Sequence, residues 1–512
     1  MPRGAGSGER TACATKAQSR GGVPLAGCAG LGGVPARPPG QDDGAPVGGR
    51  LPGSLRDPAR RRGATWPWEM HLDLPPALTG LRELAPGGRQ RLIARVLTQV
   101  IEEGSKPGAS RPSNYLDIEA QLIAIGGPEM SRIHSGRSRQ DMLAAYRQVV
   151  MREELLRTFG DLNDLREYLL NLAETHANAI FPAYTWGVQA QPITFGQYLL
   201  AFSEELERVA QQLTEAYARV NLSPLGVAVT GTNSFPIDRN RLAELLGFDG
   251  LLENGFGANQ LSPIRLGVEV VGIAEAAALV IAVLVEDIQV QYHQSRPWLR
   301  PVVAGGSSIM PQKLNPTGLN NLRHRIGVLL ADAWQFKLHA HNVSAGLHDY
   351  KGQEPADVLR ALGAVLRETR SELSNWVLDV ERAYEEVAQD YSAASELANV
   401  LQRVGNVPFR VAHHFASELV AFGRAHGLVP MQLPYSEARR LFSEIVSTEG
   451  YSMEFPLSEE EFRTALSPEH MVASSQVIGG PQPAEVSRML ARQRDQLQAD
   501  REWVRSRWER LE

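Results

Sequence analysis

Cysteine is almost missing from this chain of 512 residues. The two that it has, Cys13 and Cys28, lie near its beginning. Beyond position 28 the chain cannot form a disulfide framework, a thiolate zinc site or a cysteine nucleophile. Common catalytic signatures are also missing, because the sequence has no GxSxG elbow, no HExxH pair and no Walker A loop. The usual serine hydrolases, zinc peptidases and phosphate-loop enzymes therefore have no support.

Long apolar runs and a large excess of one charge are missing as well. The formal net charge is -6, which gives no reason to expect nucleic acid or a membrane surface as a partner. The longest clean apolar run, Ala276–Val285, has about ten residues with Glu275 and Glu286 at its ends, whereas a membrane span needs about 20. We therefore predict a buried core helix at this run. Separately, we expect a cytoplasmic protein.

The first 69 residues differ in composition from the rest. They contain 15 glycines and 9 prolines, with ten Lys and Arg against five Asp and Glu. Such a segment cannot bury a core, so we predict a disordered N-terminal extension over residues 1–69. A transit peptide is a poor match, because proline and glycine interrupt the segment throughout. We interpret it as an extension without function, with Met70 as a candidate for the natural start.

From His71 onward the sequence is typical of long amphipathic helices. Apolar residues recur at three- and four-residue spacing over Leu155–His176, Phe195–Ala218, Ile264–Gln291 and Glu354–Ala388. Helices of this length bury one another's apolar stripes in a bundle. We therefore predict an all-α protein with a long central helical bundle.

Polar residues gather in the turns between these helices. The stretch AGGSSIMPQKLNP, Ala304–Pro316, contains Ser307, Lys313 and Asn315. Its glycines allow backbone N–H groups to surround a serine hydroxyl, and the Lys313 cation would stabilise an alkoxide or an oxyanion. A helix beginning near Pro316 would add a favourable dipole for anions.

A second turn, SGRSRQD, places Arg137 and Arg139 on either side of Ser138. Arginine forks bind carboxylates in bidentate fashion, which indicates a small dianionic substrate. The alternative is a solvated surface turn in which Asp141 pairs with one arginine. Taken alone, the turn favours the solvated surface turn over the substrate-binding interpretation.

These stretches resemble a known family. GSSIMPQKLNP resembles the signature loop of the aspartase/fumarase superfamily, and four further stretches resemble argininosuccinate lyase in the same order: HSGRSRQD, AQPITFGQYLLAF, FPIDRNRLAELLGF and VGNVPFRVAHH. The resemblance covers roughly His71 to the C-terminus. It implies an all-α, three-domain subunit, with domains expected at 70–140, 141–392 and 393–512. It also implies a homotetramer whose active sites each draw loops from three subunits.

The resemblance also implies a reaction and its residues. The reaction is a reversible β-elimination that releases fumarate, as in arginine biosynthesis, and it needs no metal or organic cofactor. Ser307 would be the general base, and Lys313 and Asn315 would hold a substrate carboxylate and stabilise the intermediate. The remaining residues implied to bind substrate are Ser138, Arg139, Gln140, Thr185, Tyr350 and Gln353.

Several positions depart from the family's usual pattern. Trp186 replaces a histidine, and Asn320 replaces the glutamate that pairs with it. Loss of both partners indicates that the pair was lost together, since either one alone would be a poorly satisfied group. Tryptophan cannot carry a proton at neutral pH, so water, His348 or His134 would have to supply one to the leaving nitrogen.

Two further departures concern the substrate pocket. Gln140 replaces an asparagine, and the lysine expected after Gln353 is missing. That lysine would hold a carboxylate of an amino-acid leaving group. The sequence therefore leaves open argininosuccinate, a lyase that uses another amine with fumarate, and a catalytically silent structural or regulatory relative. The GRSRQD and FPIDR stretches favour the argininosuccinate branch over the cycloisomerase branch of the superfamily.

Overall fold

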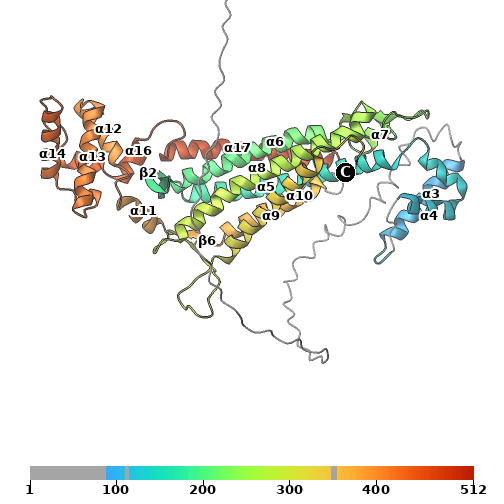
Figure 1. The fold of residues 1–512 in the computed structure, drawn as a ribbon, viewed down its shortest axis with the longest axis horizontal. Helices are drawn as coiled ribbons and strands as arrows, with labels where there is room; N and C mark the ends of the chain where they lie inside the picture. The colour runs from blue at the N-terminus through green and yellow to red at the C-terminus, as the bar shows by residue number, and fades with distance from the viewer. Residues whose placement is uncertain (1–87, 110–114, 348–353, 512) are drawn as a thin grey trace, which may run out of the picture. The chain divides into compact units, whose positions relative to one another are not determined.

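The fold is taken from a computed structural model, which describes residues 88–109, 115–347 and 354–511 (Figure 1). The N-terminal extension over residues 1–69, Met70, His348, Tyr350 and Gln353 lie outside the described residues. The predictions made for them therefore stay predictions.

The described chain is built almost entirely from helices, as predicted. The α-helices are α3 (Gly88–Ser105), α4 (Tyr115–Gly126), α5 (Arg139–Thr175), α6 (Phe195–Val220), α7 (Arg239–Leu245), α8 (Ser262–Tyr292), α9 (Thr317–Ala340), α10 (Pro355–Leu373), α11 (Val380–Ala388), α12 (Ala394–Gly405), α13 (Phe409–Ala425), α14 (Tyr435–Thr448), α15 (Glu459–Ala465), α16 (Pro468–Ser474) and α17 (Pro483–Glu509). Short 3₁₀ segments, η4 (Pro128–His134) and η7 (Pro430–Gln432), and one π-helical turn, η5 (Gly257–Leu261), join them.

The strands found among the described residues are short and paired. They are β1 (Ile180–Thr185), β2 (Val188–Thr194), β3 (Leu222–Ser223), β4 (Gly250–Leu251), β5 (Leu299–Pro301) and β6 (Trp376–Leu378). The β1–β2 and β5–β6 pairs are antiparallel, and the β3–β4 pair is parallel. These strands join the ends of helices and do not form a layer of their own.

A bundle of long helices forms the largest core. α5, α6, α8, α9, α10 and α17 lie side by side in Figure 1, and their buried faces share one hydrophobic cluster. α6 begins where Thr194 caps it by accepting a hydrogen bond from the Gln197 N–H. Inside the bundle, the fully buried Arg166 donates to Asp500 at the α5–α17 contact. α17 therefore packs with the central helices although it is last in the chain.

α8 contains the apolar run, and the prediction of a buried helix is only half right. Ala277 and Ile281 are buried, but the side chains of Leu279 and Val283 are 54% and 55% exposed. By length and composition alone, the segment Gly257–Tyr292 would be long and apolar enough to cross a membrane, and half of its most apolar window is buried inside the protein. It is a core helix with a second apolar face that the described chain does not cover.

Two smaller cores lie outside the bundle. One joins α3, α4 and η4 to the first turns of α5, and also takes in Leu225 and Leu242 from later in the chain. The other is formed by α12, α13, α14 and α15. The domain boundaries expected from the sequence stay predictions.

The helix predicted over Glu354–Ala388 is wrong, because the chain forms two helices there. α10 ends at Leu373, and β6 then pairs with β5 before α11 begins at Val380. Apolar spacing continues through the break because Trp376 and Leu378 are buried as strand residues. Periodicity alone could not distinguish these residues from a continuing helix.

Candidate active site

A closed loop projects between β5 and α9, at the stretch that the sequence singled out. Gly305 and Asn315 exchange two backbone hydrogen bonds, with N···O distances of 2.9 and 2.7 Å. The Asn315 side chain donates to the Gly306 carbonyl at 3.2 Å. Glycine is needed at 305, because a Cβ there would lie 2.7 Å from the Thr317 hydroxyl oxygen. The loop therefore has a fixed base and an exposed tip.

Ser307 lies directly beyond this base. Its hydroxyl oxygen accepts hydrogen bonds from the backbone N–H groups of Ile309, at 3.3 Å, and Met310, at 3.0 Å. Two N–H dipoles aimed at one oxygen favour its anionic form. Lys313 is exposed in the same loop, with its backbone N–H bound to the Met310 carbonyl. Ser307, Lys313 and Asn315 thus belong to one loop.

A residue that the sequence did not indicate holds the loop in place. The Asn375 side chain accepts from the Val303 N–H and donates to the Val303 carbonyl, both at 2.8 Å. The Tyr292 hydroxyl donates to the Leu314 carbonyl at 3.2 Å. Both ends of the loop are therefore tied to the bundle by side chains that are distant in sequence.

The SGRSRQD turn begins α5 and is not a solvated surface turn. Ser138 is the N-cap, and its hydroxyl accepts from the Gln140 N–H at 3.2 Å. The Asp141 carboxylate is fully buried and accepts from the backbone N–H groups of Ser138, at 2.9 Å, and Gly226, at 3.2 Å. Serine followed three residues later by an acidic residue is a capping-box pattern that could have revealed this role.

Burial changes the titration of this turn. Desolvation raises the pKa of Asp141 from 3.8 to about 6, although its backbone hydrogen bonds act in the opposite direction. Arg137 is only 6% exposed and its guanidinium makes no hydrogen bond to the described residues. Of the two arginines, it is therefore the exposed Arg139 that is free to meet a substrate from solvent.

His134, one of the two histidines considered as a proton source, lies beside these arginines. Its ring stacks on Tyr115 with 4.5 Å between centroids. Burial and the charges of Arg137 and Arg139 lower the pKa of His134 below 6.5. A histidine held neutral in this way is a poor acid at pH 7.

Thr185 and Trp186 lie at the tip of the β1–β2 hairpin. Trp186 and Gly187 occupy the turn with φ values of 56° and 74°, as the two central positions of a type I′ turn require. A bulky residue with positive φ is unusual, and the Trp186 side chain is completely exposed at 101%. Asn320, in the first turn of α9, is exposed as well.

The predicted site residues form two groups at opposite ends of the bundle. Ser138, Arg139 and Gln140 lie at the amino end of α5, whose 37 residues extend about 55 Å at 1.5 Å per residue. The other end is marked by an apolar cavity lined by His176, Ile288, Leu299 and Trp376. The β1–β2 hairpin and the Ser307 loop both leave from that second end. One chain therefore does not bring the two groups together.

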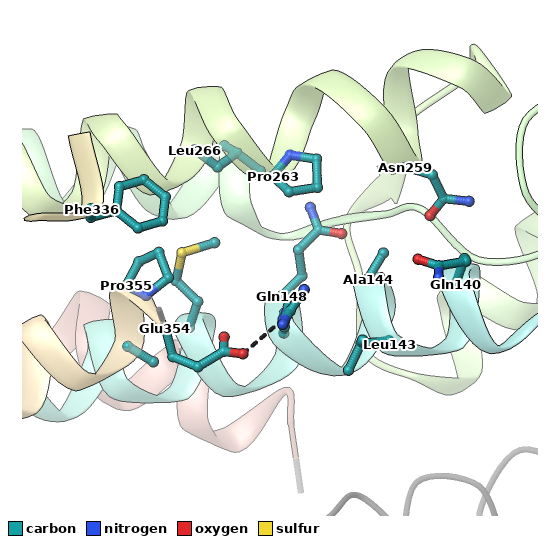
Figure 2. A pocket seen from close by; sticks show the side chains of 13 residues that line it. Gln140, Leu143, Ala144, Gln148, Asn259, Pro263, Leu266, Phe336, Glu354 and Pro355 are labelled. Atoms are coloured by element: carbon teal, nitrogen blue, oxygen red, sulfur yellow. Dashed lines mark hydrogen bonds and ion pairs between the residues drawn. The ribbon is translucent and has the colours of Figure 1, made fainter. Parts of the chain in front are cut away.

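A pocket opens beside Gln140 at the amino end of α5 (Figure 2). Its walls come from α5, η5, the first turn of α8, the last turn of α9 and the start of α10. Its empty volume is about 630 Å³, including the part open to solvent. Gln148 and Asn259 line it, and no motif in the sequence indicated either residue.

Comparison with known proteins shows the family. A family described as "Lyase" matches residues 100–329, and a family described as "Argininosuccinate lyase C-terminal" matches residues 391–473. The chain is 31% identical over 396 residues to an argininosuccinate lyase of Methanoculleus marisnigri, covering 75% of this chain and 77% of that one. It is 31% identical over 395 residues to the argininosuccinate lyase of Chromobacterium violaceum, covering 75% and 81%.

Solved structures share the fold. An EDDS lyase in complex with formate superposes with a TM-score of 0.78 at 26% identity, covering 87% of this chain and 88% of that one. A 3-carboxy-cis,cis-muconate lactonizing enzyme from Pseudomonas putida has a TM-score of 0.64 at 21% identity, covering 86% and 98%, so that likeness concerns the fold alone. The chain is an argininosuccinate lyase-like member of the aspartase/fumarase superfamily.

Proposed function

We propose that this protein is a carbon–nitrogen lyase that converts an N-substituted aspartate to fumarate and an amine, reversibly, by β-elimination. Membership of the family supports the reaction class. An EDDS lyase variant solved with bound fumarate, 26% identical to this chain, supports fumarate as the shared product. The observation that carries the proposal is the Ser307 hydroxyl, held on two backbone N–H groups in a loop of fixed base.

The loop geometry fits the demands of proton abstraction next to a carboxylate. Ser307 takes a proton from Cβ of the aspartate moiety, and the electron pair moves into the neighbouring carboxylate. Lys313 and the loop N–H groups stabilise the resulting dianion. The electron pair held in the carboxylate then forms the C=C bond of fumarate as the C–N bond breaks. The amine leaves with the electron pair of the C–N bond and gains a proton.

Proton supply to the leaving nitrogen is the part that differs from the usual family pattern. Trp186 and Asn320 stand where a histidine and a glutamate are usual, and neither carries a proton at neutral pH. The pKa of His134 is lowered and its ring is stacked on Tyr115. We infer that water or His348, which lies outside the described residues, protonates the amine.

The proposal includes a shared active site in a homotetramer in the cytoplasm. Ser138 and Ser307 leave opposite ends of the bundle, so a site containing both needs at least two chains. The apolar face of α8 that includes Leu279 and Val283 is exposed on the single chain, as is expected of a face that meets another subunit.

The competing function is a silent structural or regulatory relative, which the Trp186 and Asn320 substitutions favour. Fumarate absorbance in the ultraviolet separates the two. Argininosuccinate and a panel of N-substituted aspartates should be tested for fumarate release, and amines for addition to fumarate. Turnover of at least one substrate is the expected result, and complete inactivity in both directions would refute the lyase proposal.

A further inference from the structure

The pocket beside Gln140 follows one face of α5. Gln140, Ala144, Gln148 and Met151 line it, at spacings of four, four and three residues, which places them on one side of the helix. They lead away from the Ser138 N-cap for about 16 Å at 1.5 Å per residue. A ligand whose carboxylate lies at Ser138 and Arg139 can therefore extend along α5 into this pocket.

Gln148 is a polar side chain for which the fold gives no structural reason. It is 5% exposed, and neither its amide nitrogen nor its amide oxygen has a hydrogen-bond partner among the described residues. Figure 2 shows its side chain reaching from α5 toward Pro263 of α8, into the pocket. A buried amide without partners costs stability, so its presence indicates a ligand that supplies them.

Asn259 adds a second polar group from the opposite wall. Its amide nitrogen donates to the carbonyls of Ala228 and Val229, at 3.2 and 2.9 Å, while its amide oxygen has no partner among the described residues. Asn259 lies in the π-helical turn η5. Such turns are frequent at functional sites, because they change the direction of side chains within a helix.

The rest of the pocket is apolar and carries no unbalanced charge. Met151, Leu266 and Phe336 are buried in its walls. The charged groups in the lining are Arg147 and Glu354, which pair with each other at 2.8 Å. The first turn of α10 contributes the buried Ala356, which lies just after the segment where a lysine was expected from the family pattern.

We propose that this pocket binds the amine part of the substrate, and that the amine has an uncharged, apolar body ending in an amide or hydroxyl group that hydrogen-bonds to Gln148. The inference rests on the proposed function, because the position of the pocket relative to Ser138 and Arg139 gives it a role only if those residues hold the aspartate part. A guanidinium or a second carboxylate would find no unpaired counter-charge in this pocket, because Arg147 and Glu354 already pair with each other, and its burial would be costly. An arginine-type leaving group is therefore disfavoured.

The test compares amines in their addition to fumarate, followed by loss of fumarate absorbance with the full-length protein. The probes are 4-(aminomethyl)benzamide, benzylamine and arginine. We expect kcat/KM for 4-(aminomethyl)benzamide to exceed that for arginine by at least about tenfold. Gln148→Leu should lower the value for 4-(aminomethyl)benzamide by about tenfold and change that for benzylamine by less than about threefold.

The matched control is Gln498→Leu, the same change at an exposed position of α17, which should leave all three values unchanged. Ala356→Lys should raise the preference for arginine over benzylamine by about tenfold, because the introduced cation can pair with the carboxylate of arginine. Thermal melting checks folding, and Gln148→Leu should melt no lower than wild type. A wild-type preference for arginine, or equal losses for both neutral amines in Gln148→Leu, would overturn the inference.

A binding measurement separates this inference from the lyase proposal. If no substrate turns over in either direction, the lyase proposal fails, and calorimetric titration of 4-(aminomethyl)benzamide then decides the pocket by itself. Binding to wild type that weakens about tenfold in Gln148→Leu would support the pocket. Absence of binding, or equal binding to both proteins, would refute it.

Discussion

Ser138 and Ser307 lie at opposite ends of the same helical bundle, separated by the length of α5. Ser138 caps the amino end of α5, while the Ser307 loop leaves from the end where α5 and α8 finish. A helix of 37 residues is about 55 Å long, and no side chain reaches across that distance. Any site that uses both serines therefore contains parts of different chains.

Mixed oligomers test this separation. Arg139→Ala and Ser307→Ala should each be inactive alone, but co-expression in equal amounts should restore about a quarter of wild-type activity, because random mixing leaves that share of shared sites intact. The matched control mixes Ser307→Ala with Lys313→Ala, which lie in one loop of one chain and should not rescue each other. Equal recovery in both mixtures, or none in the first, would contradict a shared site.

Ser307 should be essential and its neighbour should not. Ser307→Ala removes the hydroxyl that Ile309 and Met310 support, and should lower kcat at least about a thousandfold if Ser307 is the base. Ser308→Ala is the matched control, since Ser308 is the next residue and is exposed. Fumarate formation measures both variants. A Ser307→Ala protein with near-normal kcat would remove Ser307 from the mechanism.

The sequence predicted those parts of the fold that depend on local spacing. The helix predicted over Phe195–Ala218 is observed as Phe195–Val220, and the one over Ile264–Gln291 as Ser262–Tyr292. The prediction of one helix over Glu354–Ala388 was wrong, because the pairing of β6 with β5 interrupts the helix. A strand that pairs with a segment more than 70 residues away leaves no local signal.

In the site, too, local features could be predicted from the sequence and long-range contacts could not. Ser307, Lys313 and Asn315 could be grouped from the sequence because one loop contains them; their roles stay predictions. Asn375 was missed, because its two hydrogen bonds to Val303 span 72 residues and no local sequence pattern indicates them. The distance between Ser138 and Ser307 could not be predicted either, because the order of motifs in a sequence does not indicate at which end of the bundle each loop lies.

Asn375 should act as a positioning residue for the loop. Asn375→Ala removes both hydrogen bonds to Val303, so the loop base loosens and kcat should fall about ten- to a hundredfold, with a smaller change in KM. Asn375→Asp keeps the acceptor for the Val303 N–H but loses the donor to the Val303 carbonyl. The kcat of Asn375→Asp should therefore lie between those of the wild type and Asn375→Ala. A merely structural role would instead lower the melting temperature and leave the kcat of the folded protein unchanged.

Asp141 should make the stability of the fold depend on pH. Burial raises its pKa in the folded protein from 3.8 to about 6. Between these values the folded state binds a proton that the unfolded state has lost, so this group's contribution to the free energy of unfolding decreases as pH rises from about 4 to about 6. Above about pH 6 the contribution of Asp141 to the free energy of unfolding no longer changes with pH and is at its least favourable value.

Asp141→Asn removes this titration. The Ser138 and Gly226 N–H groups bind different oxygens of the carboxylate, so the single amide oxygen of asparagine keeps the acceptor for one of them, and the loss of the other hydrogen bond lowers stability equally at every pH. We therefore expect the wild type to lose stability relative to Asp141→Asn as pH rises from about 4 to about 6, with no further relative change above that. Urea unfolding at several pH values measures the difference, and other titrating groups cancel between the two proteins. Parallel curves for the two proteins across this range would show that the carboxylate of Asp141 keeps an ordinary pKa.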